Sequence, residues 1–404
     1  MAPRNGEFMS YMDHCDWSRC TRCGECLSRC PVLQMDPMQA REAVEKLIQG
    51  DPCPEVLDRC SLCFNCNQYC PEGLRPHEMI LQRVAESRKK PVTAFFPYLM
   101  NGLPGPNFFR DLYTRLEQEE NAILDRWAEP PPEAPEILFT GCIGRLSCLD
   151  LERSSVLAGL PKYGPRDLCC GELQYRLGSW EAYTDRAEKT VAALSALKTG
   201  RLVCYCASCR TFLTVVLEKV YGKKLPFEVI SLYEWLWEKV QAGEIETRRP
   251  AGGQAVLSES CYASELGPGF TEALHGLAQA TGLDMVPAPH HGKENLSCGA
   301  VCFSRTQNPL KGWGPTQRAK YRDLKASGRN TAALHCPGCF LTMFPTAPLA
   351  GVKLSYLPEV FLQALGDDIT RPLKSRMPMV VKTLLSRAPL LLKKADPRTM
   401  EILK

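Results

Sequence analysis

Beyond residue 136, the hydrophobic pattern is dominated by four short apolar runs that each end in cysteine. The runs EILFTGC and RLVCYCASC come first, and QAVLSESC and TAALHCPGC have the same character further on. Short continuous apolar runs of this kind predict buried strands. Helical stretches such as WEAYTDRAEKTVAALSALKTG and TQRAKYRDLKASG lie between the members of each pair. The pattern therefore predicts an alternating α/β unit that occurs twice.

The cysteines of the two units recur at nearly constant offsets along the chain. Near-constant offsets indicate a duplication in which the cysteines lie at strand ends and in the loops that follow them. Strand ends of open α/β sheets are where ligands usually bind. The matching pairs are Cys142 and Cys261, 119 residues apart, Cys170 and Cys298, 128 apart, and Cys206 and Cys336, 130 apart.

The first 90 or so residues have a different, helical pattern. The segment DPMQAREAVEKLIQG places Ala40, Val44 and Leu47 at helical spacing and ends on Gly50, which is typical of a helix C-cap. A second helix is predicted by HEMILQRVAESRKK. Further along, four prolines in AEPPPEAPE (128–136) favour an extended, stiff spacer and mark a domain boundary.

Composition restricts the classes of protein to consider. The chain has 404 residues, enough for two or three domains, and 22 of them are cysteine. A secreted protein with that many cysteines would carry a signal peptide, whereas the start MAPRNGEFMSYMDHCDW is polar. We therefore expect reduced, cytoplasmic thiols that are available to metal. No apolar run reaches about 18 residues, so we expect no membrane span.

Charge gives one further exclusion. The chain has 49 Lys and Arg against 45 Asp and Glu, without a dominant basic block. A protein that binds nucleic acid usually concentrates cations on one face. We therefore expect no nucleic-acid partner.

Two cysteine runs in the first segment have the spacing C-x2-C-x2-C-x3-C-P, as CTRCGECLSRCP and CSLCFNCNQYCP. This is the ferredoxin spacing for cubane 4Fe-4S clusters, in which the fourth cysteine of each run binds the other cluster. Zinc ribbons also contain C-x2-C pairs, but two full runs with both prolines favour iron. We assign Cys20, Cys23, Cys26 and Cys70 to one cube, and Cys60, Cys63, Cys66 and Cys30 to the other.

The duplicated unit has longer spacings. Its first copy reads C-x26-CCG-x34-C-x2-C, whereas its second copy has Ser297 where the first cysteine of the CCG triplet should be. Gly171 and Gly299 would let the backbone turn with positive φ or approach a cluster closely. The first set is Cys142, Cys169, Cys170, Cys206 and Cys209; the second is Cys261, Cys298, Cys336 and Cys339.

With these motifs the chain resembles the CCG-domain iron–sulfur proteins typified by the catalytic heterodisulfide reductase subunits of methanogens. The resemblance implies an α+β multidomain chain: an N-terminal α-helical ferredoxin module (1–95), a helical and Pro-rich linker (96–136), a first CCG domain (137–250), and a second CCG-like domain with a C-terminal helix (251–404). It also implies that an intact five-cysteine set holds a noncubane 4Fe-4S cluster, which makes the first set the candidate active site. The four thiols of the second set suit a further 4Fe-4S cluster or zinc, and Cys302 is a candidate substitute for the missing thiol.

The resemblance further implies an iron–sulfur electron-transfer oxidoreductase subunit of an anaerobic redox complex. Electrons would pass through the two ferredoxin-type clusters to the first-copy cluster, which reduces a disulfide-type substrate. The alternative is an electron relay without substrate chemistry, which a sealed first-copy site would favour. Expected partners are other redox subunits, such as a membrane b-type cytochrome or a flavoprotein, and a disulfide or sulfur-carrier protein. The expected location is the cytoplasm, including the inner face of the membrane through a partner.

Several other residues have open interpretations. His290, His291 and His335 are either proton donors for a departing thiolate or polar residues that tune a cluster. Arg145 and Arg210 would hold an anionic substrate, cap a helix or form a surface pair. The tail MPMVVKTLLSRAPLLLKK (377–394) is either a peripheral docking helix or, as the interruption at Pro389 favours, a core helix that ends in a loop. Of the unassigned cysteines, we expect Cys148 and Cys204 to be small core residues, and Cys15 and Cys53 to line a cluster pocket.

Overall fold

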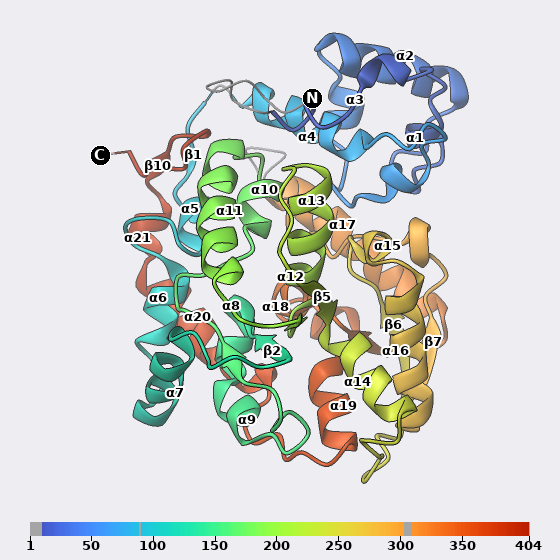
Figure 1. Cartoon of the computed structure of the whole chain (residues 1–404). Helices are drawn as coiled ribbons and strands as arrows, with labels where there is room; N and C mark the ends of the chain where they lie inside the picture. Colours follow the sequence, from blue (N-terminus) through green and yellow to red (C-terminus); the bar gives the residue numbers. More distant parts are fainter. Residues whose placement is uncertain (1–9, 89, 303–308, 404) are drawn as a thin grey trace.

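The computed structural model describes residues 10–88, 90–302 and 309–403. Its N-terminal helices form a module of their own, which sits above two α/β units that lie side by side (Figure 1). The predicted α+β class, with a helical module followed by a duplicated α/β unit, is confirmed. The predicted domain boundaries remain a prediction. Within the described residues, no helix combines the length and apolar character that a membrane span requires.

The N-terminal module is helical for the reasons that its sequence predicts. Helix α2 begins after Asp36, whose side chain accepts hydrogen bonds from the first-turn N–H groups, and it ends at Gly50 with φ of 81°. Its apolar face is buried against the other helices of the module. The helices of the module are α1 (Glu25–Ser28), α2 (Pro37–Gln49), α3 (Pro54–Leu57) and α4 (Pro76–Ser87).

The linker is mostly helical until it reaches the prolines. Residues 129–135 have no regular helix or strand, because consecutive prolines lack the N–H groups that either would need. The linker elements are β1 (Val92–Thr93), α5 (Phe95–Leu99), α6 (Phe108–Tyr113) and α7 (Gln118–Ala128).

Each α/β unit contains a four-stranded parallel sheet, and the two sheets have the same topology. The strand orders are β3-β2-β4-β5 and β7-β6-β8-β9, which confirms the duplication. The four predicted apolar runs form the two central strands of each sheet, where both faces are covered. The strands are β2 (Glu136–Phe139), β3 (Lys162–Tyr163), β4 (Arg201–Cys204), β5 (Glu228–Ser231), β6 (Gln254–Ser258), β7 (Asp284–Pro287), β8 (Thr331–Leu334) and β9 (Lys353–Tyr356).

Helices follow most of the strands, and α14 of the first unit packs against α16 of the second. This contact joins the two units along one side (Figure 1). The helices of the first unit are α8 (Gly141–Gly144), α9 (Cys148–Arg153), α10 (Glu172–Arg176), α11 (Trp180–Ser195), α12 (Ala207–Thr211), α13 (Leu217–Lys219) and α14 (Leu232–Gln241). Those of the second are α15 (Ala263–Leu266), α16 (Pro268–Ala280), α17 (Pro309–Ala326), α18 (Pro337–Met343) and α19 (Leu357–Ala364).

The C-terminal segment returns to the linker and the first unit. It contains α20 (Met377–Ser386), α21 (Ala388–Leu391) and β10 (Lys394–Ala395), which pairs antiparallel with β1. Met377 and Val380 are buried, and α20 packs on α6, as expected for a core helix. The same helix also leaves Val381 and Leu385 exposed.

Candidate iron–sulfur sites

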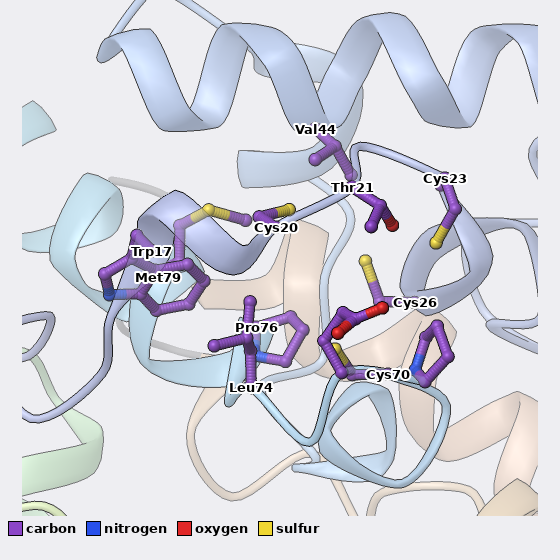
Figure 2. Close-up of a pocket in the computed structure, with 13 residues that line it drawn as sticks. Trp17, Cys20, Thr21, Cys23, Cys26, Val44, Cys70, Leu74, Pro76 and Met79 are labelled. Carbon is purple, nitrogen blue, oxygen red and sulfur yellow. The ribbon is translucent and has the colours of Figure 1, made fainter.

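The first ferredoxin-type set surrounds one pocket. Cys20, Cys23, Cys26 and Cys70 all line a pocket of about 370 Å³ that opens to solvent. Figure 2 shows these four cysteines around a common space, with Trp17 and Met79 at its side. The fourth cysteine of the second run has thus joined the first three of the first run, as crossover ligation requires.

The second ferredoxin-type set is brought together in the same way. Cys60, Cys63 and Cys30 are among the closest ionisable neighbours of Cys66. The backbone N–H of Leu62 donates to Cys60 Sγ at 3.3 Å, a contact that would stabilise a thiolate ligand. Cys66 also interacts with Cys26 of the first set, so the two sets are adjacent. Burial raises the pKa of Cys66, so the free thiol stays protonated near neutral pH. It loses its proton when a metal ion binds to it, because the metal stabilises the thiolate.

The five thiols of the first copy form one continuous chain of sulfur contacts. Cys142 and Cys170 donate hydrogen bonds to Cys169, and Cys209 lies within hydrogen-bonding reach of both Cys170 and Cys206. The two donated bonds hold the pKa of Cys169 well below its usual value. The sequence pattern alone did not show that all five thiols meet. Their contact arises because parallel strands β2 and β4 end at the same edge of the sheet.

Local backbone structure explains why each first-copy thiol reaches this edge. Cys142 lies in α8 directly after β2, and Cys206 is the N-cap of α12 directly after β4. Gly171 follows the cysteine pair with φ of 82° and caps α10. A Cβ atom at this glycine would lie 3.0 Å from the Tyr183 ring. The predicted positive φ of Gly171, and of Gly299 in the second copy with φ of 86°, is therefore confirmed.

Arg145 holds the loop that carries the cysteine pair. Its fully buried guanidinium donates to the carbonyl oxygens of three residues in this loop and to the hydroxyl of Tyr113 at 3.2 Å. These bonds use four of the five N–H groups of a fully buried side chain, so the interpretation of Arg145 as part of a surface pair is wrong. Sequence reasoning missed this role because the partners are backbone atoms, which leave no pattern of side chains. The carbonyl groups belong to Gly164 (3.0 Å), Arg166 (2.8 Å) and Leu168 (2.6 Å).

The second copy has a different arrangement. Cys339 lies between Cys298 and Cys336, and its hydrogen bond to Cys298 lowers the pKa of Cys298 to about 7. Cys261 lies near Cys298 and Cys336, and its Sγ accepts a hydrogen bond from Arg176 Nη2 at 2.9 Å. Ser297 occupies the position of the missing thiol, and its hydroxyl accepts from the backbone N–H of Gly299 at 3.1 Å. The second copy therefore has four thiols in one region, one of which is bound to an arginine, whereas the first copy has five.

His335 does not meet the requirements of a proton donor near neutral pH. His335 is buried, and its Nε2 accepts from the Ser260 N–H at 3.0 Å. Burial, with a smaller effect of Lys320, lowers the pKa of His335 to about 3, so the ring is neutral near pH 7. His290 is exposed and lies 2.6 Å from Asp323, and His291 contacts only its own loop at Ala288. These contacts match the interpretation of His290 and His291 as polar loop residues.

The remaining residues have structural partners. Arg210 forms an ion pair with Glu234 at 3.3 Å. Cys148 and Cys204 are fully buried in the core, as expected. Cys53 is also fully buried, 3.9 Å from the Ala43 carbonyl oxygen, and neither it nor Cys15 lines the pocket around the first ferredoxin-type set. Cys302 is buried and lies 3.5 Å from the Thr316 hydroxyl.

The spacing of the thiols differs between a single metal ion and a multi-iron cluster. One tetrahedral zinc ion brings all its thiolates within roughly 4 Å of each other, because each Zn–S bond is about 2.3 Å long. Among residues 10–88, 90–302 and 309–403, no three Cys, His, Asp or Glu side chains converge in that way. In an iron–sulfur cluster the cysteines bind different iron atoms and are spaced further apart.

Comparisons with known proteins give matches over the segments that contain these cysteines. The family described as 4Fe-4S dicluster domain matches residues 16–74, and the family described as Cysteine-rich domain (CCG) matches 137–214 and 256–344. The D-type subunit of the dihydromethanophenazine:CoB–CoM heterodisulfide reductase of Methanosarcina acetivorans is 23% identical, over 87% of this chain and 94% of that protein. Its counterpart in Methanosarcina barkeri is 23% identical over 70% of this chain and 77% of that protein.

A shorter match is the glycolate oxidase iron-sulfur subunit of Escherichia coli, 30% identical over 23% of this chain and 26% of that protein. The heterodisulfide reductase matches extend across most of the chain, and both CCG matches coincide with the two parallel sheets. The chain therefore contains a 4Fe-4S dicluster domain and two CCG domains, and it is an iron–sulfur electron-transfer protein homologous to the D-type subunit of heterodisulfide reductase.

Proposed function

We propose that this chain reduces a disulfide-type substrate at its first CCG copy, with electrons that arrive through the two ferredoxin-type sites. The observation that carries the proposal is the continuous chain of five thiols at the carboxyl edge of β2 and β4. The second copy lacks this arrangement, because Ser297 replaces one thiol and Cys261 is bound to Arg176. The substrate class is taken from the names of the heterodisulfide reductase relatives.

The cysteines would divide into four ligand sets. When bound, the clusters would supply one-electron transfer and, in the first copy, iron that can bind a substrate sulfur. Reduction of one disulfide consumes two electrons and two protons and releases two thiols. The sets are Cys20, Cys23, Cys26 and Cys70; Cys60, Cys63, Cys66 and Cys30; Cys142, Cys169, Cys170, Cys206 and Cys209; and Cys261, Cys298, Cys336 and Cys339.

The burial of these sets suggests where electrons arrive. Cys20, Cys23 and Cys70 are only partly buried beside their open pocket, whereas Cys60 and Cys63 are buried. A donor subunit would dock at the exposed pocket, because electron transfer requires a close approach. We propose a membrane b-type cytochrome or a flavoprotein as this donor, which would bring the chain to the inner face of the membrane.

Burial of the first-copy thiols also supports the alternative function. Cys169 and Cys170 are 7% and 6% exposed, and Cys209 is 2% exposed. A site closed to this degree suits an electron relay between partners that has no substrate chemistry of its own. Cys142 is more exposed than the others, and it is the thiol that a substrate would approach first.

The test is anaerobic reconstitution of the whole chain with iron and sulfide. The proposal predicts at least about twelve iron atoms, because the two ferredoxin-type centres and the first-copy centre each hold four, and about sixteen iron atoms without zinc would indicate a fourth cluster in the second copy. It also predicts reduction of a disulfide by a reduced viologen dye, and an EPR signal that changes when the disulfide is added. The matched control is Cys148→Ala, which removes a buried thiol of the same unit outside the ligand set. Full iron content without activity or a disulfide-dependent signal would support the relay instead.

A further inference from the structure

Arg176 connects three parts of the molecule at a single buried guanidinium. It is the last residue of α10 in the first copy and is 2% exposed. Its Nη2 donates to the Leu62 carbonyl oxygen in the ferredoxin module at 3.0 Å and to Cys261 Sγ in the second copy at 2.9 Å. Its Nη1 forms an ion pair with Glu172 at 3.1 Å.

The surroundings of Arg176 show that these contacts lie in an interface. The ferredoxin-type loop that contains Leu62 docks on the second copy, because Asn65 donates to the Asn295 carbonyl oxygen at 2.9 Å. Asn295 in turn donates to the Ser260 carbonyl oxygen at 3.0 Å, next to Cys261. Arg176 also lies over the Phe64 ring, 5.6 Å from its centroid. The loop of Cys60 and Cys63 is thus held against a ligand loop of the second copy.

The charge of Arg176 acts directly on this second-copy site. A guanidinium remains protonated even when it is buried, so a positive charge, paired on its other side with Glu172, lies against Cys261. In a protein interior such a charge interacts more strongly than it does in water. Lys320 is a second buried cation near this set. Negative charge that arrives with an electron is therefore stabilised at this position.

We propose that Arg176 is a positioning residue for electron transfer, which raises the reduction potential of the second-copy centre and holds the ferredoxin-type loop against it. This inference rests on the proposed function in one respect, the presence of a redox-active cluster at Cys261, Cys298, Cys336 and Cys339. The electron comes from the adjacent ferredoxin-type centre, reduced by a low-potential one-electron donor. No bond is made or broken in this transfer.

The experiment is a redox titration of the reconstituted chain, followed by EPR, in Arg176→Met and Arg176→Lys variants. The second-copy signal is identified as the one that Cys339→Ser removes. We expect Arg176→Met to lower the ratio of reduced to oxidised second-copy centre at least tenfold at a fixed potential, which corresponds to a shift of at least about 59 mV. The other three centres should keep their potentials. Arg176→Lys keeps the positive charge, so its second-copy reduction potential should lie close to that of the wild type.

The matched control is Arg88→Met. Arg88 donates to the Leu177 carbonyl oxygen in the same region, and its guanidinium contacts no thiol among the residues that the structure describes. An unchanged second-copy potential in Arg176→Met, or an equal shift in Arg88→Met, would overturn the inference. If Arg176→Met does not fold, the comparison uses Arg176→Lys. A second-copy reduction potential in Arg176→Lys equal to that in Arg88→Met supports the inference. A tenfold lower ratio of reduced to oxidised second-copy centre in Arg176→Lys overturns it.

Failure of the inference and failure of the proposed function give different results. If the chain does not reduce disulfides but Arg176→Met shifts the second-copy potential, the result supports the inference and contradicts the catalytic proposal. A chain that reduces disulfides while its second copy holds zinc or no metal overturns the inference and retains the catalytic proposal.

Discussion

The hydroxyl groups of Ser208 and Tyr262 lie 2.5 Å apart in the protein interior. Ser208 lies between Cys206 and Cys209 of the first copy, and Tyr262 follows Cys261 of the second. The ligand loops of the two copies therefore face each other, although more than fifty residues separate these hydroxyls in sequence. This contact, with the Arg176 contact to Cys261, gives a continuous series of loops from the ferredoxin module through the second copy to the first.

Ser297→Cys tests why the two copies differ. The substitution returns a thiol to the position that corresponds to Cys169, beside Cys298 in a fully buried loop. We expect the Mössbauer spectrum of the second-copy centre to acquire features of the first-copy centre. Loss of the hydroxyl that accepts from Gly299 N–H should cost about 1 kcal/mol of stability. Ser258→Cys adds a buried thiol elsewhere in the same unit and should leave all spectra unchanged.

Arg145→Met tests the loop that carries the cysteine pair. The variant loses the bonds that hold Gly164, Arg166 and Leu168, and it leaves their carbonyl groups buried without a donor. We expect a loss of at least ~3 kcal/mol in the free energy of unfolding and loss of the first-copy centre, with the ferredoxin-type centres kept. Urea denaturation and iron analysis measure the two effects.

The control for this prediction removes an arginine that reaches the same loop from outside. Arg110 forms a surface ion pair with Asp167 at 3.1 Å, and both side chains are about half exposed. We expect Arg110→Met to change stability by at most about 1 kcal/mol and to keep the first-copy centre. Equal effects of Arg110→Met and Arg145→Met would contradict a specific role for Arg145.

The sequence was sufficient to predict the elements with strong periodicity. The apolar runs before Cys142 and Cys206 became the central strands of the first sheet, and Gly50 ended its helix as predicted. The edge strands β3, β5, β7 and β9 were not predicted, because they are short or lack a distinctive apolar run.

The site was predictable only as far as spacing shows it. Motif spacing selected the cysteines, and the fold places each predicted set in one region. Arg145 donates to backbone carbonyl groups, and Arg176 donates to the thiol of Cys261, which lies 85 residues further along the chain. No local sequence pattern encodes either contact. His335 looked like a proton donor in sequence, but its burial and its bond from Ser260 make it an acceptor.

Glu359 predicts a pH dependence of stability. Burial raises the pKa of this carboxyl group from 4.5 to about 7. Because the folded chain binds this proton more tightly than the unfolded chain does, Glu359 lowers stability as pH rises from about 4.5 to about 7. At about 1.4 kcal/mol for each pH unit, the loss is at most ~3 kcal/mol.

Glu359→Gln should therefore raise the melting temperature above pH 7 and lose this advantage near pH 4.5. Thermal unfolding at both pH values measures the effect. Glu181→Gln, at an exposed position on α11, should behave like the wild type at both. A Glu359→Gln variant whose advantage is the same at both pH values would contradict the assignment.

The asymmetry between the two copies is tested most directly by the Mössbauer and EPR spectra of Cys169→Ser. Cys169 accepts hydrogen bonds from two neighbouring thiols and lies near the middle of the five-thiol chain. Our account predicts that the variant loses or changes the first-copy spectrum alone, with the other three centres intact. A first-copy spectrum identical to that of the wild type would contradict the account, because the adjacent cysteines would then have no part in a special centre.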